Sequence, residues 1–189
     1  MEFINTHEEI PGHTVLEDGQ PRRSFVVAGH TITAASLIVT RIDKDHGLQF
    51  LLVNINTPRG TQFQSLGGKV GPKDLHWKMT AMREFLEETG YCLDSAHIMS
   101  ALMSTSAVVV HNKQSRHLYM FFRPGCSEKC TMEWGKLNKN RMSPEDKERV
   151  LQVKWLTINE CTTEFTLRPD VKSAITFFVE AFEKQNNEQ

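Results

Sequence analysis

Residues 83–91 have the sequence "REFLEETGY", with an arginine and three glutamates in six positions before a glycine. On a helix at ~100° per residue, Glu87 and Glu88 lie within about 60° of Glu84, whereas Phe85 lies towards the opposite side. Like charges at this spacing repel by about 0.2–0.5 kcal/mol per pair. A divalent cation such as Mg²⁺ or Mn²⁺, which takes clustered carboxylate oxygens, would offset that repulsion. The stretch therefore predicts a helix with one packing face and one carboxylate face.

The alternative interpretation is a solvated acidic face, which is the usual meaning of clustered charge on a helix. The preceding residues, "SLGGKVGPKD" at 65–74, favour a site instead, because they place two glycines shortly before the helix. Gly67 and Gly68 are expected to let the backbone turn sharply and to let a carbonyl approach an ion or a phosphate. We expect the helix to run from Leu75 to Thr89, with Asp74 as its N-cap and Gly90 at its end.

Glycines, a short spacer and a three-carboxylate helix in this order resemble the Nudix box, G-x5-E-x7-R-E-U-x-E-E-x-G-U, where U is a bulky apolar residue. Gly68 matches the first glycine, and the second half is matched in full by Arg83, Glu84, Phe85, Glu87, Glu88, Gly90 and Tyr91. One departure exists: the first acidic position falls on Asp74 rather than on a glutamate, and one extra residue separates it from Arg83. We infer that the site survives and that the path of the loop differs.

The resemblance implies an α/β fold, an α/β/α sandwich around a central mixed β-sheet, and hydrolysis of a diphosphate bond in a nucleoside diphosphate linked to another group. It implies Mg²⁺ or Mn²⁺ as cofactor, because phosphoryl transfer needs charge neutralisation and positioning. The implied metal ligands are Glu84, Glu87, Glu88 and the carbonyl of Gly67. In catalysis, Glu84 would alternatively accept a proton from the attacking water, and Arg83 would orient the glutamates.

Family members often recruit a further acid from outside the box. The candidates here are Glu145, Asp146 and Glu148, of which we favour Glu148 as a catalytic residue, with Glu133 and Glu128 as fallbacks. Lys69 and Gly68 are candidates for substrate binding, since they adjoin the phosphate-facing loop. Four aromatic side chains are candidates for stacking on a base, although buried aromatics are commoner: Phe63, Trp77, Tyr119 and Trp134.

The rest of the chain alternates strand and helix patterns, which indicates the α/β class. β-Branched and apolar runs predict strands at 34–42, 48–55, 101–112, 116–124 and 150–158. An apolar stripe at i, i+4, i+7 and i+11 predicts a helix from about Pro169, and Ser143 is expected to cap a short helical turn. We divide the chain into an N-terminal extension at 1–33 with a hairpin around Asp18-Gly19, a Nudix-like domain at 34–185, and a polar tail at 186–189.

Composition limits the partners. Lys plus Arg is 22 and Asp plus Glu is 23, a net charge of −1, which argues against bulk binding of nucleic acid. Free nucleotides, nucleotide sugars or dinucleotides are therefore favoured over capped RNA. No apolar signal stretch or membrane span is visible, so we expect a cytoplasmic protein without membrane attachment. A homodimer is an open expectation.

Two other hypotheses stay open. The chain could be a Nudix-fold module that binds a nucleotide or a protein partner without turnover; the displaced Asp74 favours this, and the intact glutamates disfavour it. Zinc is a minor alternative at Cys126 and Cys130 with His111 and His117 upstream, although the spacing fits no standard finger.

Overall fold

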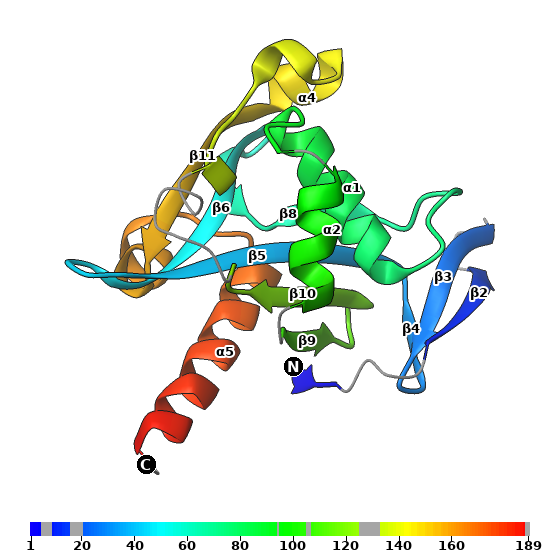
Figure 1. Cartoon of the computed structure of the whole chain (residues 1–189), viewed down its shortest axis with the longest axis horizontal. Coiled ribbons are helices and arrows are strands. Elements are labelled where there is room, and N and C mark those ends of the chain that lie inside the picture. Colours follow the sequence, from blue (N-terminus) through cyan, green and yellow to red (C-terminus); the bar gives the residue numbers. More distant parts are fainter. Residues whose placement is uncertain (5–8, 16–20, 94, 105–106, 125–132, 188–189) are drawn as a thin grey trace.

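The computed structural model describes residues 1–189 except 5–8, 16–20, 94, 105–106, 125–132 and 188–189 (Figure 1). The main sheet has the strand order β1-β9-β10-β5-β6-β11, with β7 also paired to β6 and β8 to β5. Its strands are β1 (Glu2–Phe3), β5 (Ala34–Asp43), β6 (Gly47–Thr57), β7 (Gly60–Gln64), β8 (Leu66–Lys69), β9 (Val108–Asn112), β10 (His117–Phe122) and β11 (Val150–Thr157). β10 runs parallel to β5, and the other pairs are antiparallel, so the predicted mixed sheet is confirmed.

Helices cover both faces of this sheet. α1 (Trp77–Thr89) and α2 (Ser95–Ser104) pack on one face, and α5 (Pro169–Asn187) packs on the other (Figure 1). Shorter helical segments are η1 (Lys139–Arg141), α4 (Pro144–Arg149) and the π-helix η2 (Glu160–Glu164). The α/β/α sandwich is therefore confirmed. No helix in the described part of the chain combines the length and apolarity that crossing a membrane requires.

Two apolar cores form because side chains alternate along the central strand. Leu37 and Val39 of β5 join the core beneath α1 and α2, whereas Ile38 joins the core beneath α5. The predicted stripe on α5 is confirmed at Val171 and Ile175, which are fully buried in the second core. A sheet buried on both faces reads as a continuous apolar run, as the sequence of β5 does.

The N-terminal region forms a second, three-stranded sheet of β2 (Glu9–Val15), β3 (Pro21–Val27) and β4 (His30–Ile32). β2 and β3 pair antiparallel, as a hairpin requires; its turn at Asp18-Gly19 lies outside the described residues. The two-residue turn between β3 and β4 has positive φ at Ala28 and Gly29 (48° and 78°), a combination typical of a type I′ hairpin. Phe25 and Val27 are fully buried in the core beneath α1 and α2, so this region packs more closely on the domain than an extension would.

The structure corrects one sequence expectation and confirms another. The strand predicted from residue 101 begins only at Val108, because residues up to Ser104 belong to α2. The apolar segment at the start of this predicted strand is too short to show a periodicity that would distinguish a buried helix from a strand. Ser143 does cap α4, as predicted, since its hydroxyl accepts a hydrogen bond from the Asp146 N–H.

A polar contact fastens α5 to the sheet. The Tyr119 hydroxyl of β10 donates to Asp170 Oδ2 at 2.7 Å, and Arg168 Nε donates to Asp170 Oδ1 at 2.7 Å. Tyr119 is fully buried, and Asp170 lies in the first turn of α5. The contact therefore fixes the point at which α5 begins its path across the sheet.

We predict that Tyr119→Phe lowers the free energy of unfolding by about 1–3 kcal/mol, because it removes one donor from a part-buried carboxylate. Urea unfolding measures the loss. Tyr91→Phe is the matched control, since Tyr91 is 41% exposed, and it should change stability by less than about 0.5 kcal/mol. Equal effects of the two changes would contradict this role of Tyr119.

We also predict a loss of stability at acid pH through Asp170. Burial alone would raise the pKa of this carboxyl, but hydrogen bonds from Arg168 and Tyr119 outweigh it and lower the pKa to about 2. The contribution to folding is thus complete above about pH 4 and disappears as the pH falls through about 2. Unfolding free energies of the parent and Asp170→Asn should converge over that range; a gap independent of pH would refute the prediction.

Candidate active site

The acid-bearing helix α1 begins two residues later than expected. The side chain of His76 is its N-cap and accepts a hydrogen bond from the Lys78 N–H, so Asp74 is not the cap. Gly90 ends the helix with a left-handed φ of 69°, as predicted. Leu75 lies outside the helix and is 68% exposed, whereas Trp77 supplies the first buried side chain.

Asp74 instead closes the loop that leads into α1. Its Oδ2 accepts the Gly71 N–H at 2.7 Å and the Thr80 hydroxyl at 2.8 Å. The side chain is buried, which would raise its pKa, but hydrogen bonds from Arg83, Gly71 and Thr80 outweigh the burial and lower the pKa. Asp74 is therefore a charged anchor of the loop, despite its departure from the box pattern.

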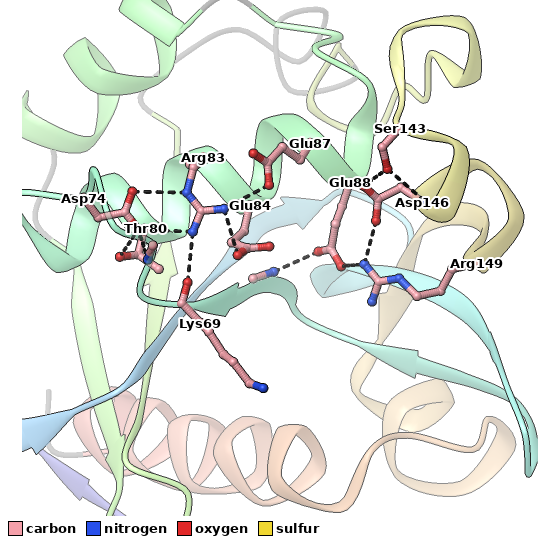
Figure 2. A network of polar contacts seen from close by, with 12 residues as sticks. Lys69, Asp74, Thr80, Arg83, Glu84, Glu87, Glu88, Ser143, Asp146 and Arg149 are labelled. Carbon is pink, nitrogen blue, oxygen red and sulfur yellow. Dashed lines mark hydrogen bonds and ion pairs between the residues drawn. The ribbon is translucent and has the colours of Figure 1, made fainter. Parts of the chain in front are cut away.

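Arg83 connects this anchor to the carboxylate face (Figure 2). Its Nε donates to Asp74 Oδ1 at 3.1 Å, and one terminal nitrogen donates to the Lys69 carbonyl at 2.9 Å. The other terminal nitrogen lies 2.9 Å from both Glu84 Oε1 and Glu87 Oε2. A single guanidinium thus holds the loop, the end of β8 and two glutamates in one arrangement.

Glu88, one residue beyond Glu87, is almost fully buried. Its Oε2 accepts the Gly67 N–H at 2.9 Å, and its Oε1 accepts from Arg149 of α4 at 2.7 Å (Figure 2). Burial raises the pKa of Glu88 to about 7, although Arg149 and the Gly67 N–H favour the charged form. The carboxylate therefore ionises at an energetic cost that an added positive charge would reduce.

The two glycines of the box lie in strand β8, where neither has a positive φ. Our expectation of a sharp turn there was wrong; close approach is the reason for glycine. A Cβ on Gly68 would lie 2.4–2.5 Å from the carboxylate of Glu84, and one on Gly67 would lie 2.0 Å from Ser36 Oγ. The bare backbone lets β8 pass between β5 and the helix.

These residues fit a divalent cation. Glu84, Glu87 and Glu88 come from one helix face, and burial raises the pKa of Glu84 although Arg83 opposes it. Electrostatic repulsion from Glu87 also raises the pKa of Glu84, and repulsion from Glu84 raises the pKa of Glu88. The three carboxylates are therefore close enough to repel one another. Two arginines face these three carboxylates, so their negative charge is compensated only in part. Clustered carboxylate oxygens of this kind are what Mg²⁺ and Mn²⁺ bind in proteins.

The residues outside the box are placed differently from what the sequence suggested. Glu148 is exposed on α4, and its carboxylate makes no hydrogen bond or ion pair with the described residues. Asp146 is the acid that faces the site, because it lies 3.0 Å from Arg149. Lys69 contributes its carbonyl to Arg83, while its side chain extends away from the cluster (Figure 2).

Sequence reasoning missed Arg149, which joins Glu88 from 61 residues further along the chain. The available signal was the Ser143 cap, which predicts a helical turn and so places Asp146 and Arg149 on one side at i, i+3.

The other candidates are buried in the core or lie outside the described residues. All four stacking candidates are buried: Phe63, Trp77, Tyr119 and Trp134. His117 is buried beside Ser36, with its Nε2 2.6 Å from Ser36 Oγ, and His111 is buried beside Glu2. Glu133 forms an exposed ion pair with Lys136; Glu128, Cys126 and Cys130 lie outside the described residues.

Comparison with known proteins gives one family match. The family model described as the NUDIX domain matches residues 31–178 of this chain. The structure is similar to a Nudix hydrolase from M. smegmatis, RenU (TM-score 0.46, 13% identity, 92% of this chain and 96% of that one). It is also similar to a Nudix hydrolase from Nitrosomonas europaea (TM-score 0.43, 17% identity, 79% of this chain and 90% of that one). A third similar structure is the NUDIX domain of Shewanella oneidensis NrtR, solved with ADP ribose (TM-score 0.49, 15% identity, 80% of this chain and 88% of that one). No curated protein sequence matches significantly.

We predict that Arg83→Lys destabilises the fold by about 2–4 kcal/mol, because an ammonium cannot replace the forked contact and leaves Asp74 partly unpaired. Urea unfolding measures the loss. Arg59→Lys, at an exposed position between β6 and β7, is the control and should be nearly neutral. A double-mutant cycle with Asp74→Asn should show coupling above about 1 kcal/mol; additive effects would mean that the contact contributes little.

Proposed function

The chain belongs to the Nudix hydrolase family, and from this premise we propose that it is a divalent-metal-dependent hydrolase. Its substrate would be a nucleoside diphosphate linked to another group, and the bond cleaved would be the diphosphate bond. The observation that carries the proposal is the convergence of Glu84, Glu87 and Glu88 beside the glycine strand β8, with Arg83 holding two of the three.

Each residue has a proposed role. Glu84, Glu87, Glu88 and the Gly67 carbonyl would hold Mg²⁺ or Mn²⁺. When bound, the ion would neutralise the negative oxygens of the diphosphate. Arg83 sets the direction of the two carboxylates through a hydrogen bond to Glu87 and an ion pair with Glu84.

The proton from the attacking water needs an acceptor. Glu84 is one candidate, because it lies on the carboxylate face beside the bare backbone of Gly68. The other is an acid from α4. Glu148, our preferred residue from sequence, stays a candidate, and the contact of Asp146 with Arg149 supports Asp146 beside it. Comparing Asp146→Asn with Glu148→Gln would separate the two.

The balanced charge supports small nucleotide substrates: free nucleotides, nucleotide sugars or dinucleotides, with capped RNA less favoured. Lys69, exposed at the end of β8, is a candidate for a phosphate contact, with the Gly68 backbone next to it. Cys92 and Cys161 are free thiols, which supports the proposed reducing cytoplasmic location.

We predict turnover of at least one member of a panel of free nucleotides, nucleotide sugars, dinucleoside polyphosphates and cap analogues when Mg²⁺ or Mn²⁺ is present. Chelation by EDTA should abolish it. Glu87→Gln should lower kcat/KM by at least about 100-fold, because it removes one metal-facing charge from a partly exposed position. Product formation is followed by chromatography.

Glu180→Gln is the matched control: it removes the same charge from an exposed position on α5, across the sheet, and should leave activity unchanged. A binding module would behave differently. It would show stabilisation by a nucleotide in thermal unfolding, with no product at any metal concentration. That outcome would replace the hydrolase proposal with the binding alternative.

A further inference from the structure

A second group of metal-type side chains lies away from the box. Glu2 of β1, His30 of β4 and His111 of β9 each place one ligand atom within 4.8 Å of the other two. His111 Nδ1 lies 2.9 Å from Glu2 Oε1, and His30 Nε2 lies 3.3 Å from the same oxygen. The two imidazole centroids are 4.6 Å apart. In Figure 1, β1, β9 and β4 lie at the opposite end of the view from α4.

Backbone geometry brings the three together. Glu2 is directly opposite His111 in the antiparallel register of β1 and β9. His30 is the first residue after the tight turn at Ala28 and Gly29, and it begins the last strand of the small sheet. Two ligands therefore come from the edge of the main sheet and one from the N-terminal sheet.

His111 is the buried member of the group. Its side chain is only 3% exposed, and its Nε2 meets no hydrogen-bond partner among the described residues. A neutral imidazole has one N–H and one lone pair, and only its Nδ1 is matched, by Glu2. An ion at Nδ1 would take the place of the hydrogen bond with Glu2, and Nε2 would then carry the ring proton.

The surroundings tolerate an ion. Among the residues that the structure describes, the cation in contact with this group is Lys113, whose Nζ lies 2.9 Å from Glu2 Oε2. Lys113 is 66% exposed and can swing into solvent. His30 is 32% exposed, which leaves a path to the site.

We propose that Glu2, His30 and His111 form a binding site for a divalent transition-metal ion of the Zn²⁺ type. Two imidazoles and a carboxylate suit Zn²⁺ better than Mg²⁺, which prefers oxygen ligands alone. Tetrahedral zinc separates its ligand atoms by about 3.4 Å at bond lengths near 2.1 Å. The separations from Glu2 Oε1, 2.9 and 3.3 Å, require only small shifts.

The site would clamp the N-terminal sheet to the edge of the main sheet. It differs from the zinc alternative that the sequence raised, which joined His111 and His117 to two cysteines. His117 is occupied with Ser36 in the core, and His111 faces His30 and Glu2. It is also independent of the hydrolase proposal, because none of the three residues belongs to the box.

The test uses the full chain without a polyhistidine tag, in a Glu84→Gln/Glu87→Gln background that weakens ion binding at the box. Zn²⁺ alone is titrated against a chromophoric chelator, and thermal unfolding is followed in parallel. We expect one ion per chain and a rise in Tm of about 5 °C at saturating Zn²⁺. Co²⁺ should give the visible absorption of a tetrahedral site without the near-ultraviolet band of a thiolate ligand.

His30→Ala should weaken Zn²⁺ binding by at least about 100-fold, since it deletes one of three ligands from a half-exposed position. His46→Ala, in the exposed turn between β5 and β6, is the matched control and should bind as the parent does. Lys113→Ala should tighten binding severalfold by freeing Glu2. The proposal is overturned if the parent binds no Zn²⁺ below about 10 µM, if His30→Ala binds as tightly as the parent, or if the cobalt spectrum shows thiolate.

Discussion

Groups from three parts of the chain meet at the guanidinium of Arg83: the Asp74 carboxylate from the loop, the Lys69 carbonyl from β8, and the Glu84 and Glu87 carboxylates from α1 itself. Removing the arginine would leave all four groups without their shared donor. The fork of arginine suits this task because its nitrogens point in fixed directions. The carboxylate face is thereby a rigid part of the fold, with its geometry set before any ligand arrives.

The sheet provides the platform for that arrangement. β8 is short and carries two glycines, so it can pack against β5 on one side while Glu84 and Glu88 approach it on the other. α4 directly precedes β11 and reaches the same place, where its last residue, Arg149, contacts Glu88. Two arginines from distant segments thus share the negative charge of one helix face, which explains how a buried glutamate is tolerated there.

Local patterns predicted much of this from sequence. The continuous apolar runs of β5 and β6, the stripe on α5 and the charge spacing on α1 are all local signals, and the family resemblance predicted the sandwich fold. Three features escaped because they depend on tertiary contacts. Arg149 is far from Glu88 in sequence. Asp74 fixes the loop and does not cap the helix. The first four residues of the strand expected at 101–112 belong to α2. No local signal reports which distant partner a polar side chain will find.

The pairing of β1 with β9 joins residues 109 positions apart, whereas β5 and β6 are joined by a short turn. As a nascent chain leaves the ribosome, β5 and β6 can associate early, but β1 must wait until β9 has been made, and distant pairings form slowly. A strand that is made early is therefore among the last to be paired. Completion of this outer edge of the sheet depends on a long-range pairing, whereas the hairpin of β5 and β6 depends on a local one.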